Sequence, residues 1–206
     1  DPPTLKRVLA TLLGRPDEVM LELGAGGELL VAKVRALLSL LVLALPLVSG
    51  LLGPADSNEV LIGLGAAVFI NIMAQVWLAL ARNPRRHRWL PFATGTYDIT
   101  TTSGVLVLLA LNDPAAGLNS MIVWCFYLIA IGLTALRNDG RLTLYVGSLA
   151  IGQYIALIAA VMLLAPRPLM SIDYGTVTLG GQVERLVLLL IMALLTSTIV
   201  YRMQRL

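Results

Sequence analysis

Six long apolar runs, separated by short clusters of polar residues, dominate the pattern of this sequence. They lie at roughly Val34–Gly53, Val60–Ala81, Pro91–Leu111, Ser120–Leu136, Leu142–Ala165 and Val183–Met203. A helix needs about 20 mostly apolar residues to cross the hydrocarbon core of a bilayer, so each run can span a membrane. The pattern therefore predicts an all-α integral membrane protein, built as a bundle of six transmembrane helices.

Turn-forming and helix-breaking residues bound the predicted spans. They are Gly53-Pro54, Asn83-Pro84 and Asp113-Pro114 after the first three spans, Asn138-Asp139-Gly140 between the fourth and fifth, and Pro166-Arg167-Pro168 after the fifth. The third run is the most polar, because threonines, Ser103 and Asp98 fill its first half. Gly50 and Gly53 in the first run, and Gly63 and Gly65 in the second, indicate places where helices pack closely.

Residues 1–32 precede the first span and form a cytoplasmic or interfacial segment in our division of the chain. Residues 33–201 form the six-helix membrane domain, and residues 202–206 begin a cytoplasmic signalling helix. Apolar residues of the first segment recur at helical spacing opposite Lys6 and Arg7, which favours a helix lying on the inner leaflet. A second short apolar stretch, Val19–Leu23, precedes Gly24-Ala25-Gly26-Gly27, where we expect the helix to break.

The composition supports a membrane protein and excludes several other classes. Hydrophobic residues make up 58% of the chain and charged residues only 13%, whereas about 25% of a soluble domain is charged. The single cysteine, Cys125, lies inside an apolar run, so it has no disulfide partner and no set of metal ligands around it. The basic residues flank the spans rather than forming one face, so no nucleic acid is expected as a partner.

The distribution of Lys and Arg orients the chain in the membrane. With the N-terminus inside, thirteen of these residues fall on inner segments, and only Arg167 and Arg185 fall outside. The positive-inside rule therefore places both termini in the cytoplasm. This count assigns Arg35, at the start of the first run, and Arg137, directly after the fourth, to the inner side.

Polar residues at membrane depth are the main candidates for a ligand site, because they are costly in hydrocarbon. Asn71 and Gln75 lie four apart in the second span, Asp98 lies about two turns into the third, and Gln153 and Tyr154 lie in the middle of the fifth. In a compact bundle these side chains could converge on one polar pocket. The alternative is a set of interhelical hydrogen bonds that holds the helices in register and binds nothing.

The longest predicted outer loop, Pro166–Gln182, is polar and contains a Gly180-Gly181 pair. Such a loop could form a lid over an outward-facing cavity, or it could be a plain connector.

Several short motifs resemble the membrane input region of certain bacterial diguanylate cyclases. The matching residues are Tyr97-Asp98-Ile99-Thr100, Asn112-Asp113-Pro114, Leu118-Asn119-Ser120, Phe126–Ala130, Thr134–Arg137 with Asp139 and Arg141, Gln153-Tyr154, and the stretch from Gln182 to Leu206. The resemblance covers roughly Thr4 to Leu206. In that family, a six-helix N-terminal region precedes a short signalling helix and a cytoplasmic GGDEF domain, which condenses two GTP into cyclic di-GMP.

The resemblance implies a sensory or regulatory domain of the bacterial inner membrane that controls such an output domain through dimer geometry. No Gly-Gly-Asp/Glu-Glu-Phe motif occurs in this chain, so GTP and Mg are expected only in the output domain, and no catalytic, metal or cofactor site is expected here. Similar membrane regions precede adenylate cyclases and histidine kinases. A small transporter or channel remains the alternative from another class, and a membrane-embedded enzyme is disfavoured because no nucleophile–base or metal set is present.

The last span is the predicted dimerisation and signalling element, since a diguanylate cyclase needs two catalytic domains. Its apolar stripe and its exit residues are Leu186, Leu189, Leu190, Ala193 and Val200, followed by Arg202 and Arg205. The same stripe could equally pack inside its own bundle. The partners we expect are the lipid bilayer, a second copy of the chain, and an unidentified small-molecule or lipid ligand.

Overall fold

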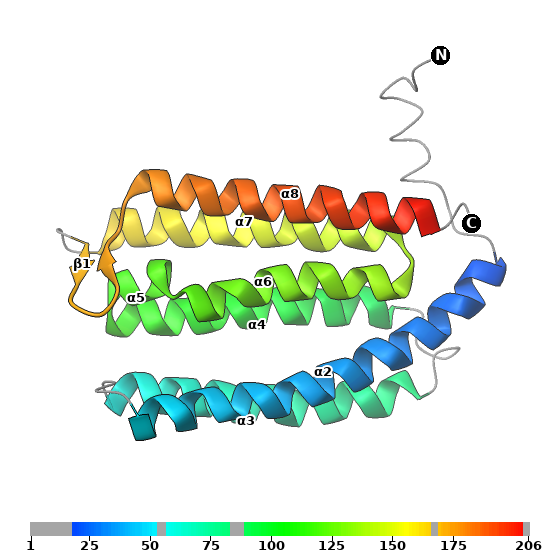
Figure 1. Cartoon of the computed structure of the whole chain (residues 1–206), viewed down its shortest axis with the longest axis horizontal. Coiled ribbons are helices and arrows are strands. Elements are labelled where there is room, and N and C mark those ends of the chain that lie inside the picture. The colour runs from blue at the N-terminus through cyan, green and yellow to red at the C-terminus, as the bar shows by residue number, and fades with distance from the viewer. Residues whose placement is uncertain (1–17, 53–56, 83–88, 166–168, 204–206) are drawn as a thin grey trace, which may run out of the picture.

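The computed structural model describes residues 18–52, 57–82, 89–165 and 169–203. Long helices lie alongside one another and alternate in direction, and a small β-hairpin covers one end of the bundle (Figure 1). The first described helix begins at the end of the bundle that lies away from the hairpin, and the last described helix ends there (Figure 1). The fold class is therefore an all-α bundle, as the apolar runs predict.

The helices follow the predicted runs closely, apart from the first. They are α2 (Glu18–Leu52), α3 (Ser57–Ala81), α4 (Leu90–Asn112), the short α5 (Pro114–Asn119), α6 (Met121–Leu133), the 3₁₀ turn η1 (Thr134–Arg137), α7 (Gly140–Leu164) and α8 (Leu179–Met203). In the described part of the chain, five helical stretches are long and apolar enough to cross a membrane: Gly27–Val48, Asn58–Ala81, Pro114–Arg137, Gly140–Leu164 and Leu179–Met203. The chain thus has the character of a multi-pass membrane protein.

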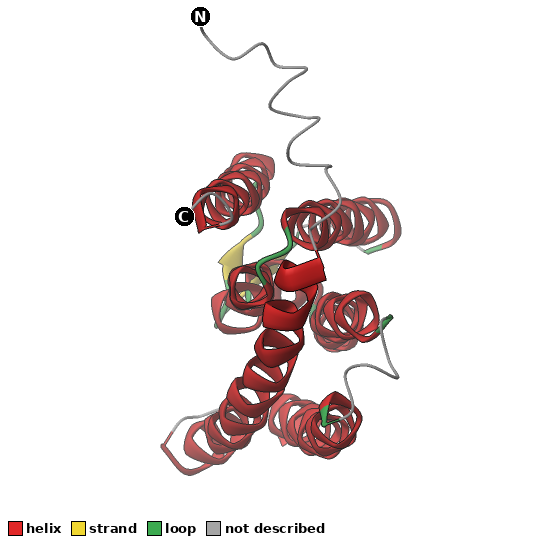
Figure 2. Cartoon of the chain, turned by 90° about the vertical axis from the view of Figure 1, so that its right-hand side faces the viewer, coloured by secondary structure: helices red, strands yellow, loops and turns green. Residues whose placement is uncertain are grey.

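Helix α4 corresponds to the third predicted span, but it is not among these five apolar stretches. Its length is sufficient, and its first half is polar. It packs against α3, α5, α6 and α7, while one side of the helix stays open to the outside of the bundle (Figure 2). Its buried polar side chains, such as Thr94 and Thr102, are tolerated because they face neighbouring helices rather than lipid.

Helix α2 corrects the prediction of a break at Gly24-Ala25-Gly26-Gly27, since it runs through these residues without interruption. The division between residues 32 and 33 also falls inside this continuous helix, and residues 1–17 lie outside the described part of the chain. The physical reason is packing. A Cβ at Gly27 would collide with the carbonyl oxygen of Leu136, so glycine here allows α2 to cross η1 closely. This contact outweighs the low helix propensity of glycine.

The hydrophobic core lies among α4, α6, α7 and α8, and it is centred on Trp124, Tyr127, Tyr154 and Leu189. Helices α2 and α3 form a separate antiparallel pair beside this core (Figure 1). A Cβ at Gly63 would lie 3.2 Å from Pro46 Cβ, and one at Gly50 would lie 3.3 Å from Val60 Cγ1, which confirms close packing at these two glycines. The prediction is wrong for Gly65, where no atom lies within 4 Å, and Gly53 lies outside the described residues. The molecule therefore consists of a four-helix core and an attached helix pair.

A two-stranded antiparallel hairpin, β1 (Met170–Ser171) and β2 (Gly175–Thr176), links α7 to α8. Gly175 has a φ of 69°, which glycine adopts readily in a tight turn. Asn119, at the end of α5, donates from Nδ2 to the carbonyl oxygens of Tyr174 at 2.9 Å and Thr176 at 3.3 Å. The hairpin is thereby fixed against the helix ends beneath it.

Candidate functional site

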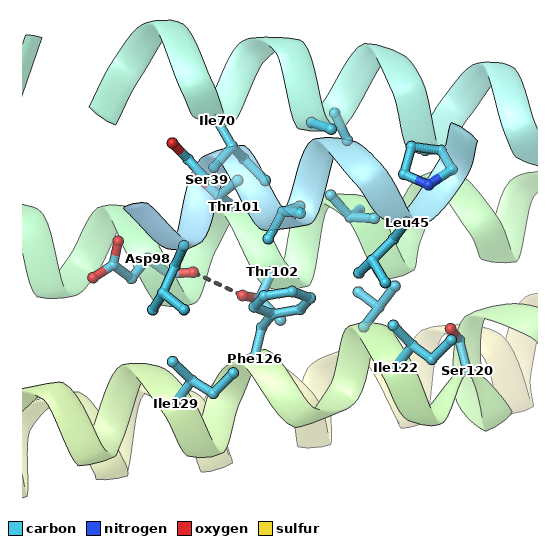
Figure 3. A pocket seen from close by; sticks show the side chains of 18 of the residues that line it. Ser39, Leu45, Ile70, Asp98, Thr101, Thr102, Ser120, Ile122, Phe126 and Ile129 are labelled. Atoms are coloured by element: carbon cyan, nitrogen blue, oxygen red, sulfur yellow. Dashed lines mark hydrogen bonds between the residues drawn. The ribbon is translucent and has the colours of Figure 1, made fainter. Parts of the chain in front are cut away.

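A cavity of about 290 Å³ lies between the α2–α3 pair and helices α4 and α6 (Figure 3). Most of its lining is apolar and comes from all four helices, including Val42, Val60, Val105 and Phe126. Polar side chains gather at the end where α2 and α4 approach: Arg35, Ser39, Asp98, Thr101 and Thr102. Apolar walls with a few convergent polar groups are typical of small-molecule binding sites.

Arg35 and Asp98 form a buried ion pair at the polar end of the cavity. Arg35 Nη2 lies 2.5 Å from Asp98 Oδ2, and Arg35 is only 6% exposed. The other two guanidinium nitrogens of Arg35, Nε and Nη1, have no hydrogen-bond partner among the described residues. Arg35 thus neutralises Asp98 with one nitrogen and keeps unused donors beside the cavity.

Asp98 was predicted as a site residue but its partner was not, because Arg35 lies at the start of the first predicted span and was counted among the inner charges. In the structure, the apolar stretch of α2 begins at Gly27, so Arg35 lies well inside it. A signal for this was present in the sequence. Glu28, Val31, Arg35 and Ser39 recur at helical spacing, and all four are buried on one face of α2.

A second buried ion pair lies closer to the end of the bundle where α2 crosses η1. Arg137 Nε lies 2.7 Å from Glu28 Oε2, and both side chains are almost completely buried. Arg137 Nη2 also donates to Thr94 Oγ1 at 2.7 Å, and Nη1 donates to the carbonyl oxygen of Pro91 at 3.2 Å. Arg137, which the charge count assigned to a loop, therefore joins α2, α4 and η1.

The structure does not bring the five predicted site residues together. Asn71 donates to Ser39 Oγ at 3.2 Å, one helical turn beyond Arg35, whereas Gln75 is exposed. Gln153 accepts from Ser103 Oγ at 2.5 Å and donates to Thr100 Oγ1 at 3.1 Å, between α4 and α7. Of the five residues, only Asp98 lines the cavity.

Tyr154, the fifth of these residues, belongs to a buried polar cluster near the hairpin. Its hydroxyl donates to Gln182 Oε1 at 2.6 Å. In the same region Arg185 donates to the carbonyl oxygens of Leu118 and Asn119, and its guanidinium lies 5.8 Å from the ring centre of Trp124. These contacts join α8 to α5 and α6, so Tyr154 and Asn71 match the interhelical hydrogen-bond alternative better than a shared ligand site.

The hairpin contributes Tyr174 to the end of the cavity opposite Arg35. The Tyr174 hydroxyl donates to Glu59 Oε2 of α3 at 3.0 Å. Burial, together with the hydrogen bond to the Glu59 carboxylate, raises the pKa of Tyr174 to about 12, so this hydroxyl stays protonated at physiological pH. The described part of Pro166–Gln182 therefore closes one end of the cavity, which favours a lid over a plain connector.

The predicted stripe on α8 packs largely inside the bundle. Leu189, Ala193 and Val200 are buried, and a Cβ at Gly147 of α7 would lie 2.6 Å from Ala193 Cβ. Leu186 is partly buried and Leu190 is 49% exposed. Arg202 is exposed at the end of α8, and Arg205 lies outside the described residues. The stripe thus corresponds to the second possibility, packing within its own bundle.

The cavity offers the chemistry of binding: polar groups at both ends, Arg35 and Asp98 at one and Tyr174 and Glu59 at the other, and apolar contact between them. The polar groups at its head, Arg35 and Asp98, are held by each other and by the helices that carry them. No family model, curated protein or solved structure matches this chain.

Proposed function

We propose that this chain is a sensory membrane domain, and that occupancy of the cavity between α2–α3 and α4–α6 is the signal it transmits. One observation carries the proposal: a ligand-sized cavity separates two helix groups, and a buried ion pair, Arg35–Asp98, joins these groups at one end of the cavity. A ligand between the groups would change their separation, and packed helices respond to such changes by small shifts.

Helix α8 is the element that would carry the response out of the bundle. Near its start, Gln182 and Arg185 contact α7 and α5 beside the hairpin, and further along Ala193 packs against Gly147. The helix ends at Met203, at the end of the bundle where α2 begins (Figure 1). A shift of the hairpin or of α6 would therefore move the end of α8.

The resemblance to diguanylate cyclase input regions supplies the proposed context. In it, α4 is a sixth crossing, both termini are cytoplasmic in the bacterial inner membrane, and two copies pair so that two output domains can join two GTP with Mg. Symmetric pairing of like chains is the commonest form of association. An adenylate cyclase or a histidine kinase remains an alternative output.

A transporter is the second candidate, because an ion pair at membrane depth is also a feature of transport pathways. The exposed residues that line the cavity, Leu45 of α2 and Ile122 and Ile129 of α6, are all apolar. This arrangement favours a ligand exchanged with the bilayer over a solute passed across it.

Alanine insertions in the full-length protein test the proposal. We expect one, two or three alanines after Leu206 to change output with helical phase, because each residue turns a helix by about 100°. Asp98→Asn should shift the same output, since it weakens the ion pair beside the cavity. An output that ignores all three insertions, or a strictly monomeric protein in lipid nanodiscs, would contradict the mechanism.

A further inference from the structure

The unpaired hydrogen-bond donors of Arg35 indicate which polar group a ligand of the cavity would carry. A guanidinium carries only donors, and Nε and Nη1 of Arg35 have no partner among the described residues although the side chain is 93% buried. A buried donor without an acceptor loses its hydration without replacement. An acceptor atom on a ligand would supply the missing partner.

Two of the neighbouring hydroxyl groups are already engaged. Ser39 Oγ donates to the carbonyl oxygen of Ala36 at 2.8 Å and accepts from Asn71. Thr102 Oγ1 donates to the carbonyl oxygen of Asp98 at 2.9 Å, as Figure 3 shows. The buried groups at the head of the cavity without a hydrogen-bond partner among the described residues are Arg35, with two donors, and the Tyr97 hydroxyl.

We propose that the cavity binds an uncharged, single-chain amphiphile whose carbonyl or hydroxyl oxygen accepts hydrogen bonds from Arg35. The inference rests on the proposed sensory function and names the class of ligand that the same cavity would detect. The apolar chain would lie along Val42 and Val105 towards Tyr174 at the hairpin end.

The charge balance at the head favours an uncharged ligand. Arg35 and Asp98 already neutralise each other at a separation of 2.5 Å. A carboxylate beside them would add a second negative charge to a buried site that holds one cation, and a buried charge without its own partner is strongly unfavourable. A neutral acceptor would pair with the free donors of Arg35 without burying a second negative charge.

The shape of the cavity favours a slender chain. Its lining on α2 runs from Arg35 to Pro46, a distance of about 16 Å along a helix axis. With a volume of about 290 Å³, the cavity lies at the lower limit of ligand pockets, which begin at about 300 Å³. A long space of small volume accommodates one chain better than a bulky ring system.

The exposed residues among the cavity lining indicate how such a molecule would reach the cavity. Leu45 of α2 is 41% exposed, and Ile122 and Ile129 of α6 are 61% and 39% exposed, although all three line the cavity. The cavity is therefore accessible between α2 and α6, on a surface whose apolar side chains suit contact with acyl chains. An amphiphile dissolved in the bilayer could enter there.

The test uses the whole chain in lipid nanodiscs and a medium-chain methyl ketone, decanone, that carries a diazirine at the end of its chain. Because the carbonyl is expected at Arg35, photolabelling should mark the hairpin end of the cavity, near Val60, Ile122 or Tyr174. Unlabelled decanone and decanol should compete at least about tenfold better than decane, which has no acceptor, since a hydrogen bond to a charged group is worth about this factor or more. Decanoate should compete more weakly than decanone.

Three variants locate the site. Arg35→Lys keeps the charge opposite Asp98 and removes the planar set of donors, so decanone affinity should fall about tenfold. Ala66→Leu fills the cavity and should abolish labelling. Leu190→Phe changes an exposed residue of α8 outside the cavity and should leave labelling unchanged. If Arg35→Lys does not fold, the competition series on the unmodified protein still decides the question.

Each result bears on a separate claim. Equal competition by decane and decanone, or labelling spread over the lipid-facing surface, would overturn the assignment of Arg35 as the head-group site. If these probes fail while Asp98→Asn and the alanine insertions still change output, the sensory function stands and the ligand class is wrong. If decanone binds as expected and output never responds, the ligand class stands and the sensory function fails. Comparing protein reconstituted in defined lipid with protein purified in native membrane then shows whether the natural ligand is a bilayer component.

Discussion

Single charged residues set the character of this membrane domain. Arg35, Asp98, Glu28 and Arg137 form two buried ion pairs inside a bundle that is otherwise largely apolar. Asp98 was recognisable in the sequence because it interrupts an apolar run. Arg35 and Arg137 were not, since each lies at the edge of a run, and hydropathy cannot decide whether an edge residue faces water or a neighbouring helix.

The Glu28–Arg137 pair should contribute strongly to stability, because removing one member leaves the other charge buried. We expect Glu28→Gln to lower the free energy of unfolding by about 3–5 kcal/mol. A double-mutant cycle with Arg137→Gln, followed by denaturant unfolding in micelles, measures the coupling, and the double variant should lose less than the two single losses together.

Glu184→Gln provides the control for this cycle, because Glu184 is an exposed carboxylate of α8. Its effect should stay within about 0.5 kcal/mol. Additive losses in the cycle would mean that Glu28 and Arg137 do not interact as the structure indicates.

At the scale of helices, close crossings matter more than local propensity. The sequence predicted the positions of the later helices well, because Asn138-Asp139-Gly140 and Asp113-Pro114 stop helices in any context. It did not predict the continuity of α2 through its glycines, since that depends on a contact between Gly27 and residues more than a hundred positions away. Long-range packing of this kind leaves no periodic signal in one sequence.

Two glycines test this explanation as a matched pair. Gly27→Ala should destabilise the protein by about 1–3 kcal/mol, because the added methyl group meets the backbone of Leu136 and Arg137. Gly65→Ala adds the same methyl group where no atom lies within 4 Å, and should be neutral or stabilising by up to about 1 kcal/mol through helix propensity. Thermal unfolding of both variants decides the comparison, and equal effects would show that the crossing of α2 and η1 is not tightly packed.

For the whole molecule, the sequence predicted a helical bundle, and it anticipated one member of the candidate site. The cavity could not be predicted from the sequence, because its walls come from four helices and their relative placement is a tertiary property. The shared location of the two described chain ends agrees with the predicted topology, while the side of the membrane they face is a matter for experiment.

Cysteine labelling tests the orientation. In a Cys125→Ser background, Asp173→Cys in the hairpin should react with an impermeant maleimide on intact cells, because only two basic residues were assigned to that side. Arg202→Cys at the end of α8 should react only after permeabilisation. Labelling of Arg202→Cys in intact cells would invert the topology.

The polar first half of α4 also has a consequence for how the protein is made. As the sixth crossing of our proposal, α4 carries Asp98, whose transfer alone into the centre of a bilayer costs about 2.5–3.5 kcal/mol. Its carboxylate finds a charged partner only once α2 is beside it, through Arg35, whereas Thr94, Thr96 and Thr102 already donate to carbonyl oxygens of α4 itself. Membrane insertion of α4 is therefore not a separate event that precedes folding. We therefore expect α4 to insert more efficiently together with α2 than alone, which would couple membrane insertion to the assembly of the ligand cavity.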